Sequence, residues 1–170
     1  MSKNIIFTDK KTLDKLNNRK PIREASKKWN KKTHLLNKKI QTNLLNQVFL
    51  ENEFDDQKYV KKELEKKRNG YKNQDIKKNL FDDKNFISFN QMMEKLVISK
   101  LKCYYCRCDC LLMYDNVREK KQWTLDRLNN EFGHTSENTV ICCLECNLKR
   151  GTLNNEKFKF TKQLKIIKKY

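Results

Sequence analysis

Four of the seven cysteines form two pairs with the same spacing. Cys103 and Cys106 are the ends of CYYC, and Cys143 and Cys146 are the ends of CLEC. Two residues between thiols let both sulfurs turn toward one ion, and four thiolates make a closed tetrahedral zinc site with no position left for water. The spacing therefore predicts a structural Zn²⁺ ion rather than a catalytic one.

The other three cysteines lie close to these pairs. Cys108 and Cys110 follow the first pair, and Cys142 adjoins Cys143. Only Cys143 keeps the two-residue gap to Cys146, so we interpret Cys142 as a small buried residue on a strand. We expect Cys108 and Cys110 on the strand that leaves the first pair. Whether any of the three competes for the ion is left open by the sequence.

The two pairs need elements that bring them together. The segment between Cys106 and Cys143 is longer than the loop of a simple zinc ribbon, and it fits a treble-clef arrangement with a hairpin before a final helix. Gly151 suits the end of that helix. The expected elements are strands over 111–114, 122–125 and 139–142, and a helix over 144–150.

Apolar periodicity predicts helices before the first pair. Pro21 suits the first turn of a helix, and apolar residues then recur every three or four positions as far as Val48. A second helix is expected over 58–68, ending at Gly70 because glycine favours the left-handed conformation that closes helices. Residues 71–86 show little pattern beyond a short helix around 74–80.

A third helix leads directly into Cys103. Ser88 and Gln91 have the spacing of a capping box, and apolar residues from Phe89 to Leu101 share one helical face. The simplest interpretation of this face is hydrophobic core.

The charge of the chain points to a polyanion as its partner. The net charge is +18, from 39 Lys and Arg against 21 Asp and Glu, and the pI is about 9.6. Such a balance is typical of nucleic-acid binders, although a solvated lysine-rich surface is the simpler alternative. No apolar run is long enough for a membrane helix, and no signal peptide is evident. We therefore expect an intracellular, non-secreted protein whose thiols stay reduced.

Four stretches of the carboxy-terminal half carry a family resemblance: CYYC, QWTLDRLNN, GHTSEN and CLECNLKRG. With them the sequence resembles the HNH endonuclease superfamily, and most closely the HNH-type zinc proteins of large DNA viruses and some phages. The likeness is specific over 103–151 and extends over 58–167. Residues 1–55 lie outside it.

The resemblance implies a strand, loop, strand and helix that grip one divalent metal ion above a treble-clef zinc site. Asp126 matches the aspartate that binds the catalytic metal in this family. Asn138 matches the asparagine that orients the general-base histidine, and Asn147 matches the metal ligand on the helix. Mg²⁺ or Mn²⁺ would suit such oxygen ligands.

One position departs from the family pattern. Arg127 stands where the general-base histidine follows the aspartate, and arginine cannot accept a proton near neutral pH. His134, in the loop between the strands, is the candidate replacement base, or alternatively a buttress of that loop. Arg127 suits a phosphate clamp. Lys149 and Arg150 are candidate phosphate contacts, or simply a basic helix end.

These observations predict an α+β protein with a mostly helical, basic amino-terminal half and an HNH-like treble-clef (ββα-metal) domain. The expected divisions are a basic helical extension over 1–55, a helical lead-in over 56–101 and the zinc domain over 102–170. The first functional hypothesis is a metal-dependent endonuclease that acts on double-stranded DNA.

Two other functions compete with cutting. One is a catalytically inactive DNA-binding protein of viral genome packaging or virion structure, and the other is a zinc-stabilised protein adaptor. Residues 1–55 could contact other viral proteins. A viral protein of this kind would be located in the host cytoplasm, the nucleus or the virion.

Overall fold

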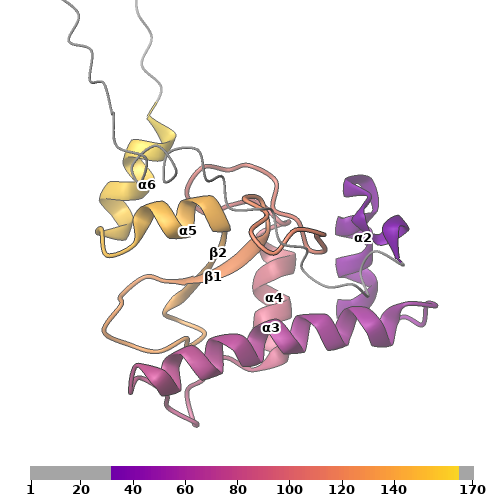
Figure 1. Cartoon of the computed structure of the whole chain (residues 1–170), viewed down its shortest axis with the longest axis horizontal. Helices are drawn as coiled ribbons and strands as arrows, with labels where there is room; N and C mark the ends of the chain where they lie inside the picture. The colour runs from indigo at the N-terminus through magenta and orange to yellow at the C-terminus, as the bar shows by residue number, and fades with distance from the viewer. Residues whose placement is uncertain (1–31, 165–170) are drawn as a thin grey trace, which may run out of the picture.

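The computed structural model describes residues 32–164, in which helices surround a two-stranded sheet (Figure 1). This confirms the α+β class. None of the described helices combines the length and the apolar character that crossing a membrane requires. The elements in chain order are η2 (Thr33–Leu36), α2 (Lys38–Phe49), α3 (Gln57–Lys77), α4 (Phe89–Ile98), β1 (Trp123–Arg127), β2 (Thr139–Cys143), α5 (Leu144–Arg150) and α6 (Asn155–Gln163).

The helix predicted from Pro21 to Val48 is not continuous. Its first part lies outside the described residues, and the rest is split between η2 and α2. Asn37 separates these two elements, and its side-chain oxygen accepts a hydrogen bond of 3.0 Å from the backbone N–H of Lys39. Asparagine is among the strongest helix N-caps, so a new helix starts here instead of the old one continuing.

Helix α3 is longer than predicted, because it runs through Gly70 to Lys77. The prediction that Gly70 ends the helix was therefore wrong. An interior glycine costs a helix only about 1 kcal/mol relative to alanine, and the buried side chains of Tyr71 and Asp75 anchor the turns beyond it. The short helix expected around 74–80 is the last turn of α3.

Helix α4 is capped as predicted. The Ser88 hydroxyl accepts from the Gln91 backbone N–H, and the Gln91 side chain accepts from the Ser88 N–H. Met92, Met93 and Leu96 on this helix are buried.

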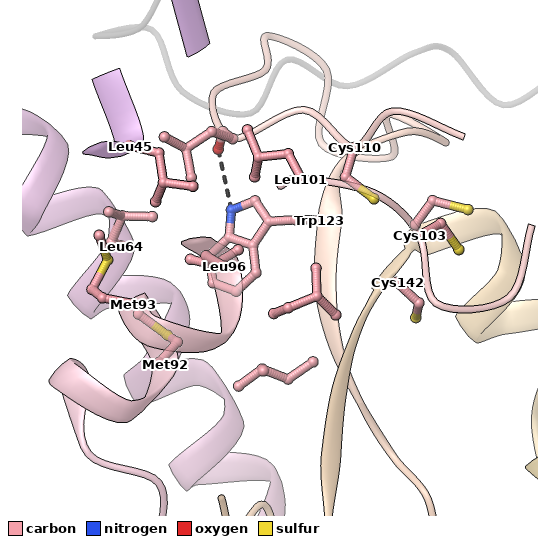
Figure 2. Packing of buried hydrophobic residues seen from close by; sticks show 14 of the residues in the cluster. Leu45, Leu64, Met92, Met93, Leu96, Leu101, Cys103, Cys110, Trp123 and Cys142 are labelled. Carbon is pink, nitrogen blue, oxygen red and sulfur yellow. Dashed lines mark hydrogen bonds between the residues drawn. The ribbon is translucent and has the colours of Figure 1, made fainter. Parts of the chain in front are cut away.

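One hydrophobic core runs through all three segments that the sequence suggested as divisions. Figure 2 shows Leu45 of α2, Leu64 of α3 and Leu96 of α4 gathered around Trp123 of β1. The indole N–H of Trp123 donates to the carbonyl oxygen of Leu112 at 3.2 Å, so its single polar group is satisfied inside the core. The described part of the predicted 1–55 extension is thus built into the same core as the cysteine-rich segment.

The sheet contains two of the three predicted strands. β1 and β2 pair antiparallel, with Asp126 opposite Val140. The strand expected over 111–114 is limited to an isolated bridge between Leu111 and Gln122. The reason is that the Gln41 side chain forms the hydrogen bonds that a neighbouring strand would otherwise form with this backbone. It accepts from the Leu112 N–H at 2.7 Å and donates to the Met113 carbonyl.

The carboxy-terminal helices follow β2 directly. α5 has the predicted bounds, and Gly151 ends it with a positive φ of 52°. α6 was not predicted; Asn154 caps it, and Phe158 packs edge-on against Tyr105 with ring centroids 5.0 Å apart. In Figure 1 the strand pair lies between α5 and α3, and this arrangement positions the polar residues described next.

Candidate metal centre and adjoining cleft

The four paired cysteines converge as predicted. The sulfurs of Cys103, Cys106, Cys143 and Cys146 all lie within 4.8 Å of one another, and those of Cys106 and Cys143 are 3.9 Å apart. Four sulfurs at zinc–thiolate distances of about 2.3 Å would be about 3.8 Å apart in a tetrahedron. The geometry and chemistry of the thiols therefore fit one metal ion such as zinc.

A tight turn positions the first pair. The Arg107 N–H donates to the Cys103 carbonyl at 3.0 Å, and the Cys103 N–H donates to the Cys108 carbonyl at 2.9 Å. Arg107 has a φ of 61°, a conformation that non-glycine residues adopt rarely. The turn brings both sulfurs to the same side of the chain.

The start of a helix positions the second pair. Cys143 is the N-cap of α5, and Cys146 lies in its first turn. The unpaired N–H groups of a helix start favour negative charge, which suits a position that carries metal-binding thiolates.

The three other cysteines do not belong to this group of four. Cys142 is buried on β2, as predicted, and its sulfur is 3.2 Å from the Thr124 hydroxyl. Burial raises the pKa of its thiol well above the usual value. The strand expected at Cys108 and Cys110 is limited to an isolated bridge between Lys102 and Asp109.

A cleft of about 750 Å³ lies beside the thiol cluster. α3 and α5 line its sides, and residues 124–127 of β1 line it between them. Five of the predicted site residues line this cleft and are thus brought together: Asp126, Arg127, His134, Asn147 and Arg150. Asn138 and Lys149 are outside its lining.

Asp126 is buried, and its carboxylate forms an ion pair with Arg150. One oxygen accepts from the Tyr105 hydroxyl at 2.6 Å and lies 2.7 Å from Nε of Arg150, and the other accepts from Nη2 of Arg150 at 3.0 Å. Burial raises the pKa of Tyr105, and the hydrogen bond to the Asp126 carboxylate raises it further. A divalent ion at Asp126 would have to displace this guanidinium.

Arg150 does not have the environment of a phosphate contact. Its side chain is buried and also donates to the Arg127 carbonyl at 2.6 Å and to Oδ1 of Asn130 at 2.9 Å. The expected phosphate contact is therefore an internal ion-pair partner. Lys149 is exposed and pairs with Glu145 at 2.7 Å, one turn back on α5.

Asn147 lies across the cleft from α3. Its amide nitrogen donates to the Thr124 hydroxyl at 3.1 Å and to the Leu125 carbonyl at 3.4 Å. Because the amide nitrogen already donates to two groups of β1, the amide oxygen is the atom that could act as an acceptor or metal ligand.

His134 is held by Asp75 of α3. The backbone N–H of His134 donates to one carboxylate oxygen at 2.6 Å, and its Nδ1 lies 2.7 Å from the other. The imidazole also packs against Tyr71, with centroids 4.8 Å apart. Burial lowers the pKa of His134 below its usual 6.5, more than Asp75 raises it. The ring is thus neutral near pH 7, and Nε2 is the nitrogen that Asp75 does not engage.

Asp75 was not among the predicted site residues. Val60, Leu64, Tyr71 and Asp75 are the buried positions of α3, and Asp75 continues their helical spacing. Because the helix was expected to end at Gly70, Asp75 fell in a separate short helix expected around 74–80, and its alignment with Val60, Leu64 and Tyr71 was not evident. A buried aspartate on the apolar face of a longer helix would have been the available signal.

Arg127 and Asn138 stabilise the loop that carries His134. Arg127 donates to the Phe132 carbonyl at 3.1 Å and lies 3.9 Å from Asp75. Asn138 accepts from the Asn129 N–H and donates to the carbonyls of Asn129 and Gly133. Asn138 therefore orders the loop backbone, and the side chain that orients the imidazole is Asp75.

Lys67 of α3 and Lys78, the C-cap residue of that helix, also line the cleft. Lys67 donates to the Tyr114 hydroxyl at 3.1 Å and lies over the Trp123 ring, 4.4 Å from its centroid. Burial lowers the pKa of Lys67 to about 7. Lys78, one end of the same helix, is exposed to solvent.

Comparison with known proteins places part of this chain next to a viral sequence. No protein-family model matches the chain, and no solved structure matches it. Over 88 residues it is 39% identical to an uncharacterized protein of Acanthamoeba polyphaga mimivirus. The match covers 52% of this chain and 14% of that protein. The chain is therefore similar to a small part of a much longer mimivirus protein.

Proposed function

We propose that the chain is an HNH-type, divalent-metal-dependent endonuclease that hydrolyses phosphodiester bonds in DNA. One observation carries the proposal: His134, oriented by Asp75, lines the same cleft as Asp126 and Asn147, beside four convergent thiols. These are a candidate base and two candidate oxygen ligands in one concave site, the arrangement that metal-assisted hydrolysis needs.

The thiol cluster supports a treble-clef assignment. Its first pair lies on a tight turn, its second pair lies at the start of α5, and β1 and β2 lie between them in the chain. A zinc ion on these thiols would fasten β2 and α5 to the turn, and so fix Asn147 relative to Asp126. The ion's part would be structural, because four thiolates leave no open coordination position.

The proton-transfer part of the mechanism follows from the Asp75–His134 pair. Neutral His134 can accept a proton from water at Nε2, while Nδ1–H donates to Asp75. The carboxylate stabilises the imidazolium that forms and fixes the ring orientation. Arg127 is held by the Phe132 carbonyl and stays protonated, so the histidine from the loop takes the place of the one missing after Asp126.

Asp126 and Asn147 would hold Mg²⁺ or Mn²⁺ once Arg150 leaves the carboxylate. When bound, such an ion neutralises charge on the scissile phosphate and on the leaving oxygen. A hard cation fits a carboxylate and an amide oxygen. Asp126 thus offers a suitable donor, at the cost of breaking a buried ion pair.

The Arg150–Asp126 ion pair also favours a second candidate, a non-cutting protein that binds nucleic acid through the same domain. In that case the guanidinium is the permanent counterion of Asp126, and the +18 net charge supplies affinity for phosphate. Packaging or organisation of a viral genome would be the matching role.

A plasmid-nicking assay separates the two candidates. Zinc-loaded full chain should nick supercoiled DNA with added Mg²⁺ or Mn²⁺, and the activity should be lost in His134→Ala and in Asn147→Ala. Asn90→Ala is the matched control for Asn147→Ala, because Asn90 is exposed on α4 and outside the lining of the cleft. Duplex binding without nicking under any metal would favour the second candidate, and no duplex binding at low salt would favour the adaptor.

A further inference from the structure

The cleft is recessed, and α3 makes it so. Asp126 and His134 are each only 4% exposed. β1 and α5 form one side of the site, while α3, which belongs to a separate part of the sequence, forms the other. Without this long helix the face that carries Asp126 would be open.

The size and shape of the cleft do not suit an intact duplex. Its volume of about 750 Å³ falls within the range of about 300–1,000 Å³ that encloses small ligands. Proteins usually read duplex DNA by placing a convex element in its grooves. A concave site between two helices is instead accessible to a flexible strand that can bend into it.

The charges of the lining suit phosphates without any added ion. Lys78 is cationic and exposed, and Arg127 is cationic with the Asp75 carboxylate 3.9 Å away. Lys67 adds a positive charge when it is protonated. Asp126 is the one carboxylate among the described residues that line the cleft, and Arg150 already neutralises it. A phosphodiester strand would therefore meet a net positive surface.

The rim offers apolar surface for bases. Leu144 is half-buried and Leu148 is 69% exposed, and both belong to the α5 side of the cleft. Single-strand binding surfaces combine a positively charged groove with side chains on which bases pack, usually aromatic ones, and here the two leucines supply the apolar contact surface.

We infer that this cleft binds a single strand of nucleic acid, or a strand locally separated from its complement, and excludes the intact duplex. The inference concerns the substrate of the site proposed above and rests on that proposal only for the identity of the reaction. The phosphate backbone would lie between Lys78 and Arg127, and the bases would contact Leu144 and Leu148.

Gly70 provides a clean way to close the cleft. It lies on the α3 side of the lining, and a Cβ placed there would meet nothing within 4 Å. Gly70→Leu therefore adds bulk to the cleft and improves the helix propensity of α3. Asn69→Leu is the matched control, because Asn69 is exposed on the same helix and outside the cleft.

The experiment measures fluorescence anisotropy of labelled oligonucleotides of about 16 nucleotides, the upper end of single-strand site sizes, with no added divalent ion. The arms are single-stranded DNA, single-stranded RNA and duplex DNA of one sequence. We expect Gly70→Leu to weaken single-strand binding about tenfold or more, which corresponds to about 1.4 kcal/mol, with duplex binding unchanged. Asn69→Leu should stay within about twofold of the parent protein.

Single-strand affinity that Gly70→Leu leaves intact overturns the inference, and so does an equal loss of duplex binding. A thermal melt at or above that of the parent protein shows that Gly70→Leu is folded. The DNA and RNA arms identify which strand binds. Because the assay contains no added Mg²⁺ or Mn²⁺, a protein that never cuts gives the same binding result, and failure of the nuclease proposal is seen separately in the nicking assay.

Discussion

The thiol cluster and the polar cleft lie on neighbouring strands, since Cys143 ends β2 and residues 124–127 of β1 line the cleft, but the two regions balance their charge in different ways. The cluster gathers four thiols from two short segments and depends on a cation from outside the protein. The cleft balances its charges within the chain, pairing His134 with Asp75 and Asp126 with Arg150, which are 59 and 24 positions apart. The first region should therefore respond to metal supply, and the second to substitution of internal partners.

The largest expected effect is loss of the metal ligand Cys143. Cys143→Ser should abolish zinc binding and unfold the segment that contains β2 and α5. Structural zinc sites contribute about 10–16 kcal/mol of apparent binding free energy, which exceeds the stability of a typical small domain. Elemental analysis should find one zinc per parent chain and none in the variant, and circular dichroism should show the loss of structure.

The adjacent cysteine supplies the control for that loss. Cys142 is buried beside Cys143 but does not belong to the group of four. Cys142→Ala should keep the zinc ion and cost about 1 kcal/mol, as for a typical substitution. Equal zinc loss in both variants would show that the ion depends on general packing, and the contrast with the cleft would disappear.

The next effect concerns the internal ion pair of the cleft. Arg150→Met leaves the carboxylate of Asp126 buried without its counterion, which should cost about 3–5 kcal/mol of unfolding free energy. Asp126→Asn in the same chain should restore part of this loss. Urea unfolding of both single variants and the double variant gives the coupling energy. If the losses of unfolding free energy in the two single variants simply added up in the double variant, the interaction between Arg150 and Asp126 would contribute nothing to stability.

The same contrast explains how much the sequence could predict. Cys103 and Cys106 reveal their role through local spacing, and Ser88 and Gln91 do so for the start of α4. Local spacing also gave the bounds of α5.

Local spacing could not predict contacts between residues that are far apart in the sequence. The carboxylate of Asp126 contacts Tyr105 and Arg150, which no local pattern links to it. The role of Asp75 required knowing that α3 continues through Gly70, and tertiary packing decided that against local glycine propensity. The strand expected at 111–114 failed for a similar reason, since a single glutamine of α2 occupies its backbone groups.

A smaller effect tests how closely the His134 loop approaches α3. A Cβ at Gly133 would lie 2.5 Å from the Leu80 carbonyl oxygen and 2.9 Å from an Asp75 carboxylate oxygen. Because a backbone carbonyl cannot easily move away, Gly133→Ala should cost about 1–3 kcal/mol. Gly70→Ala, in open space, should instead stabilise α3 by up to about 1 kcal/mol. Thermal or urea unfolding of the two variants measures the sign of each change in unfolding free energy. If Gly133→Ala left the unfolding free energy unchanged, the loop would be able to adjust freely.

The smallest expected effect is the pH dependence that His134 contributes. Its pKa in the folded protein is lowered from 6.5, chiefly by burial, so the unfolded chain binds the proton more readily. The stability from keeping this ring neutral is therefore fully present above pH 6.5 and is lost as the pH falls toward the folded pKa. The slope cannot exceed about 1.4 kcal/mol per pH unit for one group.

His134→Asn isolates this contribution, because an asparagine amide can donate to Asp75 from nearly the same position as Nδ1 without titrating. Unfolding free energies should be measured in urea at about pH 7.5 and about pH 5.5 for both proteins, on either side of the histidine range. The parent should lose more stability than the variant over this interval, while proton competition for the thiolates affects both alike and cancels in the difference. Equal losses would mean that His134 takes up its proton as easily in the folded cleft as in water, and it would then be charged rather than neutral at mildly acidic pH. A histidine of that kind would still be a partner of Asp75 and a base suited to pH 7, so this small difference in slope measures how far burial, rather than Asp75, sets the proton affinity of the candidate base.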